Sequence, residues 1–295
     1  MQVLKPLPCY PSMLVSSNAV ESYPTWAVGT TYAKDDIVVY ETGLYQSLTN
    51  SNVGNTPSID TVNWVYYGAS NTCAMFDGQV STQTVSTTPL TVTVAPGNYY
   101  NSVALLNLNA ISATVTVTAG AETLFDETYA LDETIIVDWY QYFFEPYALK
   151  TSLIIDNIPP SLSAVLTVSL SNTTGLAVKI GEMKFGSIYT LGDSEYGASL
   201  GIIDYSVKET DSFGVTTFVE RSFSKKLSTS VFCLNENLTY ITSVLQSLRA
   251  TPTVWVYSDQ QQFSPTIVYG YARDWSIDIA YQNHSLLSIE IEGLT

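Results

Sequence analysis

Few residues of this chain have the types and the spacing that catalysis requires. A Ser/His/Asp triad would have to use His284, the only histidine, which stands in the turn-like run 282–285, where we expect an exposed loop. Adjacent carboxylates occur at Asp35-Asp36, Asp126-Glu127 and Asp132-Glu133. Neighbouring side chains of a strand point to opposite faces, so such a pair cannot act on one scissile bond. The sequence therefore predicts a protein that is not an enzyme and has no catalytic residues.

The sequence also lacks the patterns that bind metals and cofactors. Its three cysteines, Cys9, Cys73 and Cys233, include no C-x2-C pair, and its acidic turns do not match a calcium-binding loop. No glycine-rich loop is followed by the lysine and helix that hold a phosphate. We expect no metal and no cofactor, and we interpret the cysteines as small buried or half-buried thiols of a protein made in a reducing cytoplasm.

The charge of the chain limits its partners. Its 295 residues carry a formal net charge of −16, and residues 1–149 contain only Lys5 and Lys34 as basic residues. Binding to nucleic acid or to an anionic membrane needs clustered Lys and Arg, so we expect neither. Pro6 and Pro8 interrupt the apolar segment that a signal peptide would need, and no apolar run is long enough to span a membrane. We therefore expect neither secretion nor membrane insertion.

Trp, Tyr and Gly recur at a distinctive spacing in residues 24–68. The run reads W-x2-G-x2-Y-x3-D-x-V-x6-Y, followed by a polar N-x-P-S loop at residues 55–58 and then by Trp64. Fewer than fifty residues provide little core, so aromatic side chains with large buried areas must supply most of the burial. The spacing predicts a very small β module.

This pattern resembles the chitin/cellulose-binding module of carbohydrate-binding families 5 and 12. The corresponding positions are Trp26, Tyr32, Asp36, Val38, Tyr45, Pro57 and Trp64. In secreted chitinases two exposed Trp residues follow the second Tyr and stack on sugar rings, whereas residues 46–50 of this chain are mostly polar and contain no Trp. Modules with this replacement look like those of tailed-bacteriophage tail and baseplate proteins. Trp26, Tyr45 and Trp64 are thus either candidates for glycan binding or simply the core of the module.

Strands are predicted through the middle of the chain. Only 13% of the residues are charged, and Tyr, Thr, Ser and Val are frequent, which favours strands over helices. Apolar or β-branched runs bounded by turn residues predict strands at residues 91–94, 113–118, 134–137 and 165–170. This spacing is typical of a β-sandwich of jelly-roll or immunoglobulin-like type.

The run 139–144 is the densest aromatic cluster of the chain. Trp139, Tyr140 and Tyr142 in this run are candidates for stacking on a sugar or on a partner. Strand alternation would instead turn about half of the run inward, into the core and along a sheet edge.

The C-terminal part contains a helical periodicity. Asn235 would cap this helix, and Leu238, Ile241, Leu245 and Leu248 recur on one face of it. A helix with one apolar face needs a sheet to cover, so we expect it to pack across an antiparallel sheet. The strands of that sheet are predicted at residues 199–207, 215–223, 253–257, 266–271, 275–281 and 286–291.

Residues 205–221 are predicted to form a long hairpin with its tip near residues 211–214, like the hairpins by which tail-tube and baseplate proteins bind the next subunit. We expect the main subunit contacts at Phe213 and at the basic residues Arg221, Lys225 and Lys226. A chain at −16 repels its own copies, so a cationic patch must offset that charge at the contact. The cations would pair with a neighbour's carboxylates, for instance from the acid-rich 122–138 region, or else form a solvated strand face.

These features predict a mainly β protein with four parts. They are an extended N-terminal arm (1–23), a carbohydrate-binding-module-like β module (24–70), a β-sandwich (71–180) and an α+β assembly domain with one helix on an antiparallel sheet (181–295). The arm is proline-rich and nearly uncharged, so it either docks onto a neighbouring surface or is a flexible terminus.

Residues 197–206 and 289–294 look similar to uncharacterised phage and prophage structural proteins that carry the same N-terminal module. The resemblance implies a structural subunit of a tailed-phage virion, at the tail tip or baseplate, assembled in the host cytoplasm. The expected partners are other tail and baseplate proteins and copies of the chain itself. One alternative is a carbohydrate-binding adhesin that recognises a glycan of the host surface. Another is an accessory module of a glycan hydrolase whose catalytic chain is elsewhere.

Overall fold

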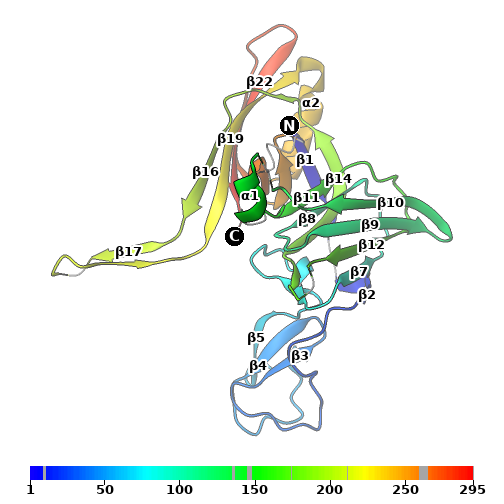
Figure 1. Ribbon diagram of the computed structural model, residues 1–295, viewed down its shortest axis with the longest axis vertical. Coiled ribbons are helices and arrows are strands. Elements are labelled where there is room, and N and C mark those ends of the chain that lie inside the picture. The colour runs from blue at the N-terminus through cyan, green and yellow to red at the C-terminus, as the bar shows by residue number, and fades with distance from the viewer. Residues whose placement is uncertain are drawn as a thin grey trace.

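The protein is mainly β, with one large curled sheet, several smaller sheets and little helix (Figure 1). The computed structural model describes residues 1–8, 11–134, 137–144, 148–173, 175–210, 212–258 and 265–294. The predicted fold class is confirmed: a small β unit, a β-sandwich and a C-terminal sheet with a helix packed on it are all present within these ranges.

The N-terminal module is built on a short antiparallel sheet, the module sheet, at the lower end of the molecule (Figure 1). Its strands are β3 (Ile37–Tyr40), β4 (Gly43–Ser47) and β5 (Trp64–Ala69). Tyr32, Val38 and Trp64 form its core, and Trp26 and Tyr45 pack against them. Aromatic rings therefore supply most of the burial in this small unit.

A second antiparallel sheet, the sandwich sheet, forms one layer of the central unit. Its strands, in spatial order, are β10 (Glu122–Ala130), β9 (Ser112–Ala119), β12 (Ala164–Ser171), β7 (Leu90–Val94) and β2 (Leu14–Ser17). Alternate residues are buried, as in β12, where Leu166, Val168 and Leu170 face inward. This period of two is the pattern that the sequence shows.

The large sheet is antiparallel and extends from the central unit into the C-terminal part of the fold. In spatial order its strands are β11 (Ser152–Ile155), β8 (Ser102–Leu106), β14 (Glu182–Thr190), β1 (Gln2–Pro6), β20 (Thr253–Val256), β21 (Ile267–Asp278), β22 (His284–Gly293), β19 (Phe223–Leu234) and β15 (Asp193–Ser194), and β16 (Ser199–Asp204) also pairs with β19. The two segments predicted at 266–271 and 275–281 are one strand, β21, with an irregularity between Ala272 and Asp274.

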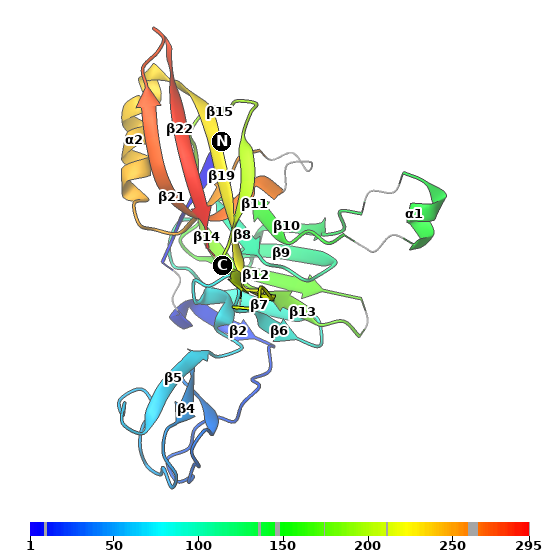
Figure 2. The same ribbon diagram turned by 90° about the vertical axis from the view of Figure 1, so that its left-hand side faces the viewer.

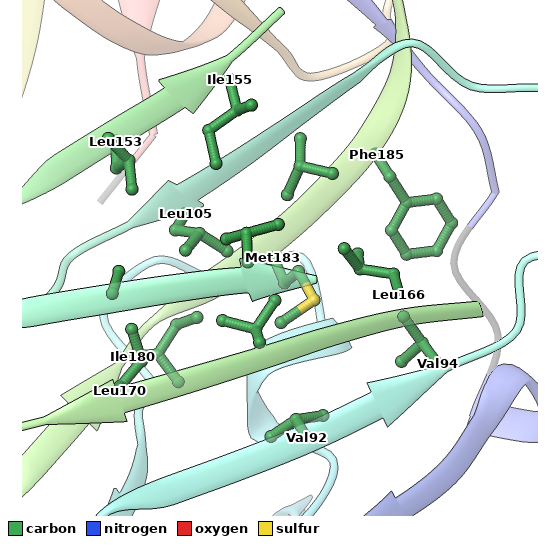
Figure 3. Packing of buried hydrophobic residues seen from close by; sticks show 14 of the residues in the cluster. Val92, Val94, Leu105, Leu153, Ile155, Leu166, Leu170, Ile180, Met183 and Phe185 are labelled. Atoms are coloured by element: carbon green, nitrogen blue, oxygen red, sulfur yellow. The ribbon is translucent and has the colours of Figure 1, made fainter. Parts of the chain in front are cut away.

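The main core lies between the sandwich sheet and the β11–β8–β14 end of the large sheet (Figure 3). Leu166 and Val94 from the first layer meet Leu105, Met183 and Phe185 from the second. The two sheets thus form the predicted β-sandwich, and one of them continues beyond it.

The N-terminal residues belong to the large sheet. β1 lies between β14 and β20, and Val3 and Leu4 are completely buried. For residues 2–6 of the predicted arm, the apolar composition is explained by burial within their own chain, so this part is not a flexible terminus. Gly186 permits the pairing, because a Cβ atom there would lie 2.1 Å from the carbonyl O of Lys5.

The large sheet also crosses the boundary expected at residue 180. β14, from the C-terminal side of that boundary, pairs with β8 from the central unit, and Phe185 belongs to the sandwich core. The central and C-terminal parts therefore share one continuous sheet.

The predicted helix is α2 (Leu238–Ser247), which covers the C-terminal part of the large sheet (Figure 2). Ile241, Leu245 and Leu248 are buried on its inner face, as predicted. Asn235 does not cap it: its Nδ2 donates hydrogen bonds to the carbonyl O atoms of Tyr281 and Gln282 at 3.0 and 2.9 Å. The cap prediction was wrong because a tertiary contact with the β21–β22 connection uses this side chain.

The remaining elements are short. They are η1 (Pro11–Met13), η2 (Ala74–Phe76), η3 (Asn235–Asn237), β6 (Thr84–Ser86) paired with β13 (Val178–Ile180), α1 (Trp139–Phe144), and the hairpin strands β17 (Val207–Thr210) and β18 (Thr216–Val219). None of the helices in the described ranges is long and apolar enough to cross a bilayer.

Candidate functional site

A line of aromatic rings runs along one face of the module sheet. The ring centroids of Trp26 and Tyr40 are 5.4 Å apart, those of Tyr40 and Tyr45 are 6.3 Å apart, and those of Tyr45 and Tyr66 are 5.6 Å apart, all edge to face. Trp26, Tyr40 and Tyr45 are half-buried, and Tyr66 is 58% exposed. Gly43 makes room for this line, since a Cβ atom there would lie 2.8 Å from the Tyr66 ring.

Trp64 is not part of an accessible surface. It is 2% exposed, its ring packs edge to face on Tyr32, and its indole N–H donates a hydrogen bond to the carbonyl O of Asn55 at 3.0 Å. The polar loop predicted at 55–58 thus closes over this side chain. Of the three module residues singled out for glycan binding, Trp26 and Tyr45 belong to the aromatic line and Trp64 belongs to the core.

The aromatic cluster at 139–144 differs most from its prediction. It forms the short helix α1, with Trp139, Tyr140, Tyr142, Phe143 and Phe144 between 60% and 76% exposed. Alternation cannot turn half of the run inward, because the run is not a strand. The core-and-edge interpretation was therefore wrong, while the strand predicted at 134–137 lies partly outside the described residues.

Backbone hydrogen bonds join the two ends of the segment that carries α1. Glu133 N–H donates to the carbonyl O of Ala148 at 2.8 Å, and Lys150 N–H donates to that of Leu131 at 2.7 Å. Figure 2 shows α1 held away from the body of the molecule. The ring–ring contacts recorded for its described side chains are with one another, for example Tyr140 with Phe144 at 5.0 Å.

The predicted long hairpin is present and projects from the molecule (Figure 1). Val207 pairs with Val219 and Thr210 with Thr216, and β17 and β18 pair only with each other among the described strands. Phe213 near the tip is 90% exposed, and β18 is exposed along its whole length. The hairpin continues the β16–β19 ladder, which anchors it to the large sheet.

The structure does not gather the basic residues into one patch. Lys225 and Lys226 are neighbours on β19, so their side chains point to opposite faces. Lys226 forms an ion pair with Glu290 of β22, which also lies 3.6 Å from Arg273. Lys225 Nζ lies 3.5 and 3.4 Å from the carbonyl O atoms of Pro265 and Ile267.

Lys225 lines a pocket of about 380 Å³. The walls come from both ends of the large sheet, with Leu106 of β8 on one side and Phe223 of β19, Tyr269 of β21 and Leu294 on the other. These strands are far apart in the sheet order, so the curl of the sheet brings them together. Burial lowers the pKa of Lys225.

A buried ion pair lies near the junction of η2 and β14. Glu182 is completely buried, its Oε1 lies 2.8 Å from Lys184 Nζ, and its Oε2 accepts a hydrogen bond from Gly78 N–H at 2.8 Å. Burial, opposed by the charge of Lys184, raises the pKa of Glu182 to about 7. Glu182 was not singled out from the sequence, because nothing local distinguishes it from other strand carboxylates.

The residues considered for catalysis have structural surroundings. His284 begins β22 and is half-buried, with its ring stacked on Tyr281 at 4.3 Å, so the exposed-loop expectation was wrong. Cys73 and Cys233 are buried free thiols, while Cys9 lies outside the described residues. Across the described residues, no group of three or more His, Cys, Asp or Glu side chains could hold a metal ion. The absence of enzymatic activity stays a prediction.

Comparisons with known proteins leave the chain without an assigned family. No family model matches it, and no curated protein matches it. One solved structure with a likeness is chitosan-binding module 1 derived from a chitosanase/glucanase of Paenibacillus sp. IK-5, with 17% identity and a TM-score of 0.27 over 40% of this chain and 84% of that one. A TM-score of 0.27 carries no argument about fold or ligand.

The sequence did not single out every aromatic residue of these two sites. Tyr40 and Tyr66 complete the aromatic line, while Phe143 and Phe144 belong to the predicted cluster 139–144 but were not among its stacking candidates. Tyr66 could have been found from its spacing, because it stands two residues after Trp64 and therefore on the same face of β5. The exposure of α1 has no comparable signal, since an aromatic-rich run of six residues usually indicates a core.

Proposed function

We propose that this protein is a structural subunit of the tail of a tailed phage, at the tail tip or baseplate. It assembles there with copies of itself and with other virion proteins. The phage assignment is supported by the resemblance of residues 24–70 and of the two C-terminal stretches to phage proteins. The observation that carries assembly is the projecting hairpin formed by β17, β18 and the tip near Phe213.

The hairpin exposes apolar side chains and open strand edges, so a partner that covers it would stabilise it. An isolated two-stranded ribbon is only marginally stable in water, and its free edges present unpaired backbone groups that can template another chain. Apolar side chains are exposed along it, including Phe213, Phe218 and Val219, and its base adds Ile202 and Phe223. A neighbouring subunit that covers the hairpin removes both apolar surface and open edges from water.

Removal of the hairpin tests the assembly. Tyr205 N–H donates to the carbonyl O of Ser222, so an Asn-Gly turn that replaces residues 206–221 joins β16 to β19 with their ladder intact. We expect the whole chain to self-associate in sedimentation velocity runs and the shortened chain to associate at least tenfold more weakly, with the same thermal unfolding midpoint. A whole chain that stays monomeric at every concentration contradicts self-assembly.

Mass spectrometry of purified phage particles tests the location. We expect peptides of this chain in wild-type particles at a constant ratio to other tail proteins. Particles made by a phage with an early stop codon in the gene for this protein should contain none. Tailed particles that lack the protein in every preparation contradict the virion assignment.

A second candidate function, glycan binding by an adhesin, is favoured by the aromatic line of the module sheet. Aromatic rings bind sugars by stacking, and Tyr66 presents an accessible ring while Tyr45 supports it. We expect Tyr66→Ala to abolish any chitin-oligosaccharide affinity seen in calorimetry, with Tyr67→Ala as the matched exposed control on the same strand. Equal effects of both substitutions contradict a site on the aromatic line.

A further inference from the structure

Two surfaces of the molecule are complementary but lie too far apart to contact each other within one chain. The first is α1, whose five aromatic side chains are exposed and surround a helix of six residues. The second is the pocket between the ends of the large sheet, whose mixed lining includes the apolar or aromatic Leu106, Phe223, Tyr269 and Leu294, several Ser, Thr and Asn side chains, and Lys225. Figure 2 shows α1 far from the C-terminal end of β22, which borders the pocket, so one chain does not fill its own pocket.

The first turn of α1 is stabilised by hydrogen bonds within its own segment. Asp138 Oδ1 accepts a hydrogen bond from Gln141 N–H at 2.8 Å, and Gln141 Oε1 accepts one from Val137 N–H at 2.7 Å. These contacts close the first turn of α1 with groups of its own segment. The backbone that carries the exposed rings is therefore ordered by contacts within the segment, and less backbone entropy is lost when a partner binds them.

The two surfaces carry opposite charges, which favours their association. The segment that carries α1 includes Asp132, Glu133 and Asp138, and Lys150 stands only at its base. In the pocket, Lys225 is the charged lining residue, and within the described ranges no carboxylate forms an ion pair with it. A partly buried cation that, among the described residues, contacts only backbone carbonyl groups is complementary to a carboxylate brought by a partner.

The size of the pocket restricts what can enter. Its volume of about 380 Å³ is near the low end of the range of about 300–1,000 Å³ for small-ligand sites. Such a space accepts one or two aromatic side chains but not a whole helix. Projecting rings such as Trp139 and Phe143 match this requirement.

We propose that α1 of one subunit inserts aromatic side chains into the pocket of a second copy, with an acidic residue of the α1 segment placed near Lys225. The inference rests on the proposed assembly function and names the two surfaces that meet. It adds to the hairpin contact a second contact between different patches of two subunits. Such a contact forms a ring or a filament when it repeats, and a closed pair when it is reciprocal.

Photo-crosslinking tests the contact directly. With benzoylphenylalanine in place of Phe143, we expect an intermolecular product whose crosslinked peptides contain residues 222–225 or 267–269. Benzoylphenylalanine in place of Tyr67, an exposed residue of the module, serves as the matched control and yields no such peptides. Crosslinks from position 143 that map elsewhere on the second copy, or only within the same chain, overturn the proposal.

Complementation between two variants provides an independent test. Trp139→Ser with Phe143→Ser disables α1, and Lys225→Glu disables the pocket, so each alone weakens association by roughly tenfold or more. An equimolar mixture restores association, since one partner supplies an intact α1 and the other an intact pocket. Failure of the mixture to recover overturns the proposal, provided that both variants keep the wild-type circular dichroism and unfolding midpoint.

The outcomes also separate the proposal from two alternatives. If the whole chain never self-associates, the proposed function fails together with the inference. If it assembles and both variants assemble equally well, only the inference fails. If α1 instead binds phosphatidylcholine vesicles, this binding is lost in the α1 variant and kept in Lys225→Glu, and no intermolecular crosslink forms, then α1 contacts a lipid surface and not a second copy.

Discussion

The sandwich sheet and the projecting hairpin are built from the same kind of strand and differ in what covers them. In β12 apolar residues alternate with Ser and Thr, and Leu166, Val168 and Leu170 are buried against a second sheet. β17 and β18 are also rich in residues that favour strands, with two Val, three Thr and one Phe among their eight residues, yet β18 is exposed throughout. Strand formation therefore follows local composition, while burial depends on the presence of another layer.

This difference explains why the two regions serve different purposes. A strand covered by its own chain contributes to the stability of the monomer, because its apolar area leaves water on folding. A strand left uncovered contributes little to the monomer and makes its apolar area available for association. Four substitutions test this contrast, each paired with a counterpart elsewhere in the molecule.

Leu166→Ala should have the largest effect. Leu166 is completely buried, so the substitution leaves a cavity and lowers the free energy of unfolding by about 2–5 kcal/mol in urea titrations. Phe218→Ala in the hairpin removes a larger side chain that is 70% exposed and should change the same quantity by less than about 0.5 kcal/mol. Similar losses in both variants would mean that the hairpin is packed against the monomer.

Glu182→Gln should change how stability depends on pH. Burial raises the pKa of Glu182 from 4.5 to about 7, so the folded state holds a proton that the unfolded state releases. The wild-type free energy of unfolding therefore falls as pH rises from about 4.5 to about 7, by at most about 3 kcal/mol from this group. Gln does not ionise, so the variant should lack this decline in urea titrations at several pH values. Glu209→Gln, in the exposed β17, controls for loss of one negative charge, and parallel profiles of Glu182→Gln and wild type would refute the prediction.

Gly186→Ala should weaken the insertion of β1. The added Cβ would meet the carbonyl O of Lys5, so the strands must shift, and we expect a loss of about 1–3 kcal/mol in the free energy of unfolding. Gly201 of β16 has no atom within 4 Å of an added Cβ, so Gly201→Ala should be neutral or slightly stabilising. Equal losses at both positions would show that strand entropy, and not the β1 contact, determines the effect.

Lys226→Met should have the smallest effect. Its ion pair with Glu290 is partly exposed to solvent, and pairs of this kind often contribute nothing measurable to stability. We expect an unchanged urea midpoint and unchanged self-association, in contrast to Lys225→Glu. A loss of association in Lys226→Met would contradict this expectation and support the predicted cationic patch, in which the neighbouring lysines act together.

The sequence by itself determined the local elements. Period-two alternation located β7, β9 and β12, the 3.6-residue period located α2, and turn residues located the projecting hairpin. The distinctive aromatic spacing also located the module sheet and its core residues Tyr32 and Trp64. These signals are local because they arise from the backbone geometry of neighbouring residues.

Only the tertiary structure decided which surfaces are covered. The N-terminal segment looks the same in sequence whether it is a free arm or a strand, and its pairing with β14 and β20 depends on residues about 180 and 250 positions away. The position of Lys225 in a pocket and of α1 in solvent likewise depends on the curl of the large sheet and on the absence of a second layer over α1. Burial is a property of pairs of distant segments, so no window of neighbouring residues contains it.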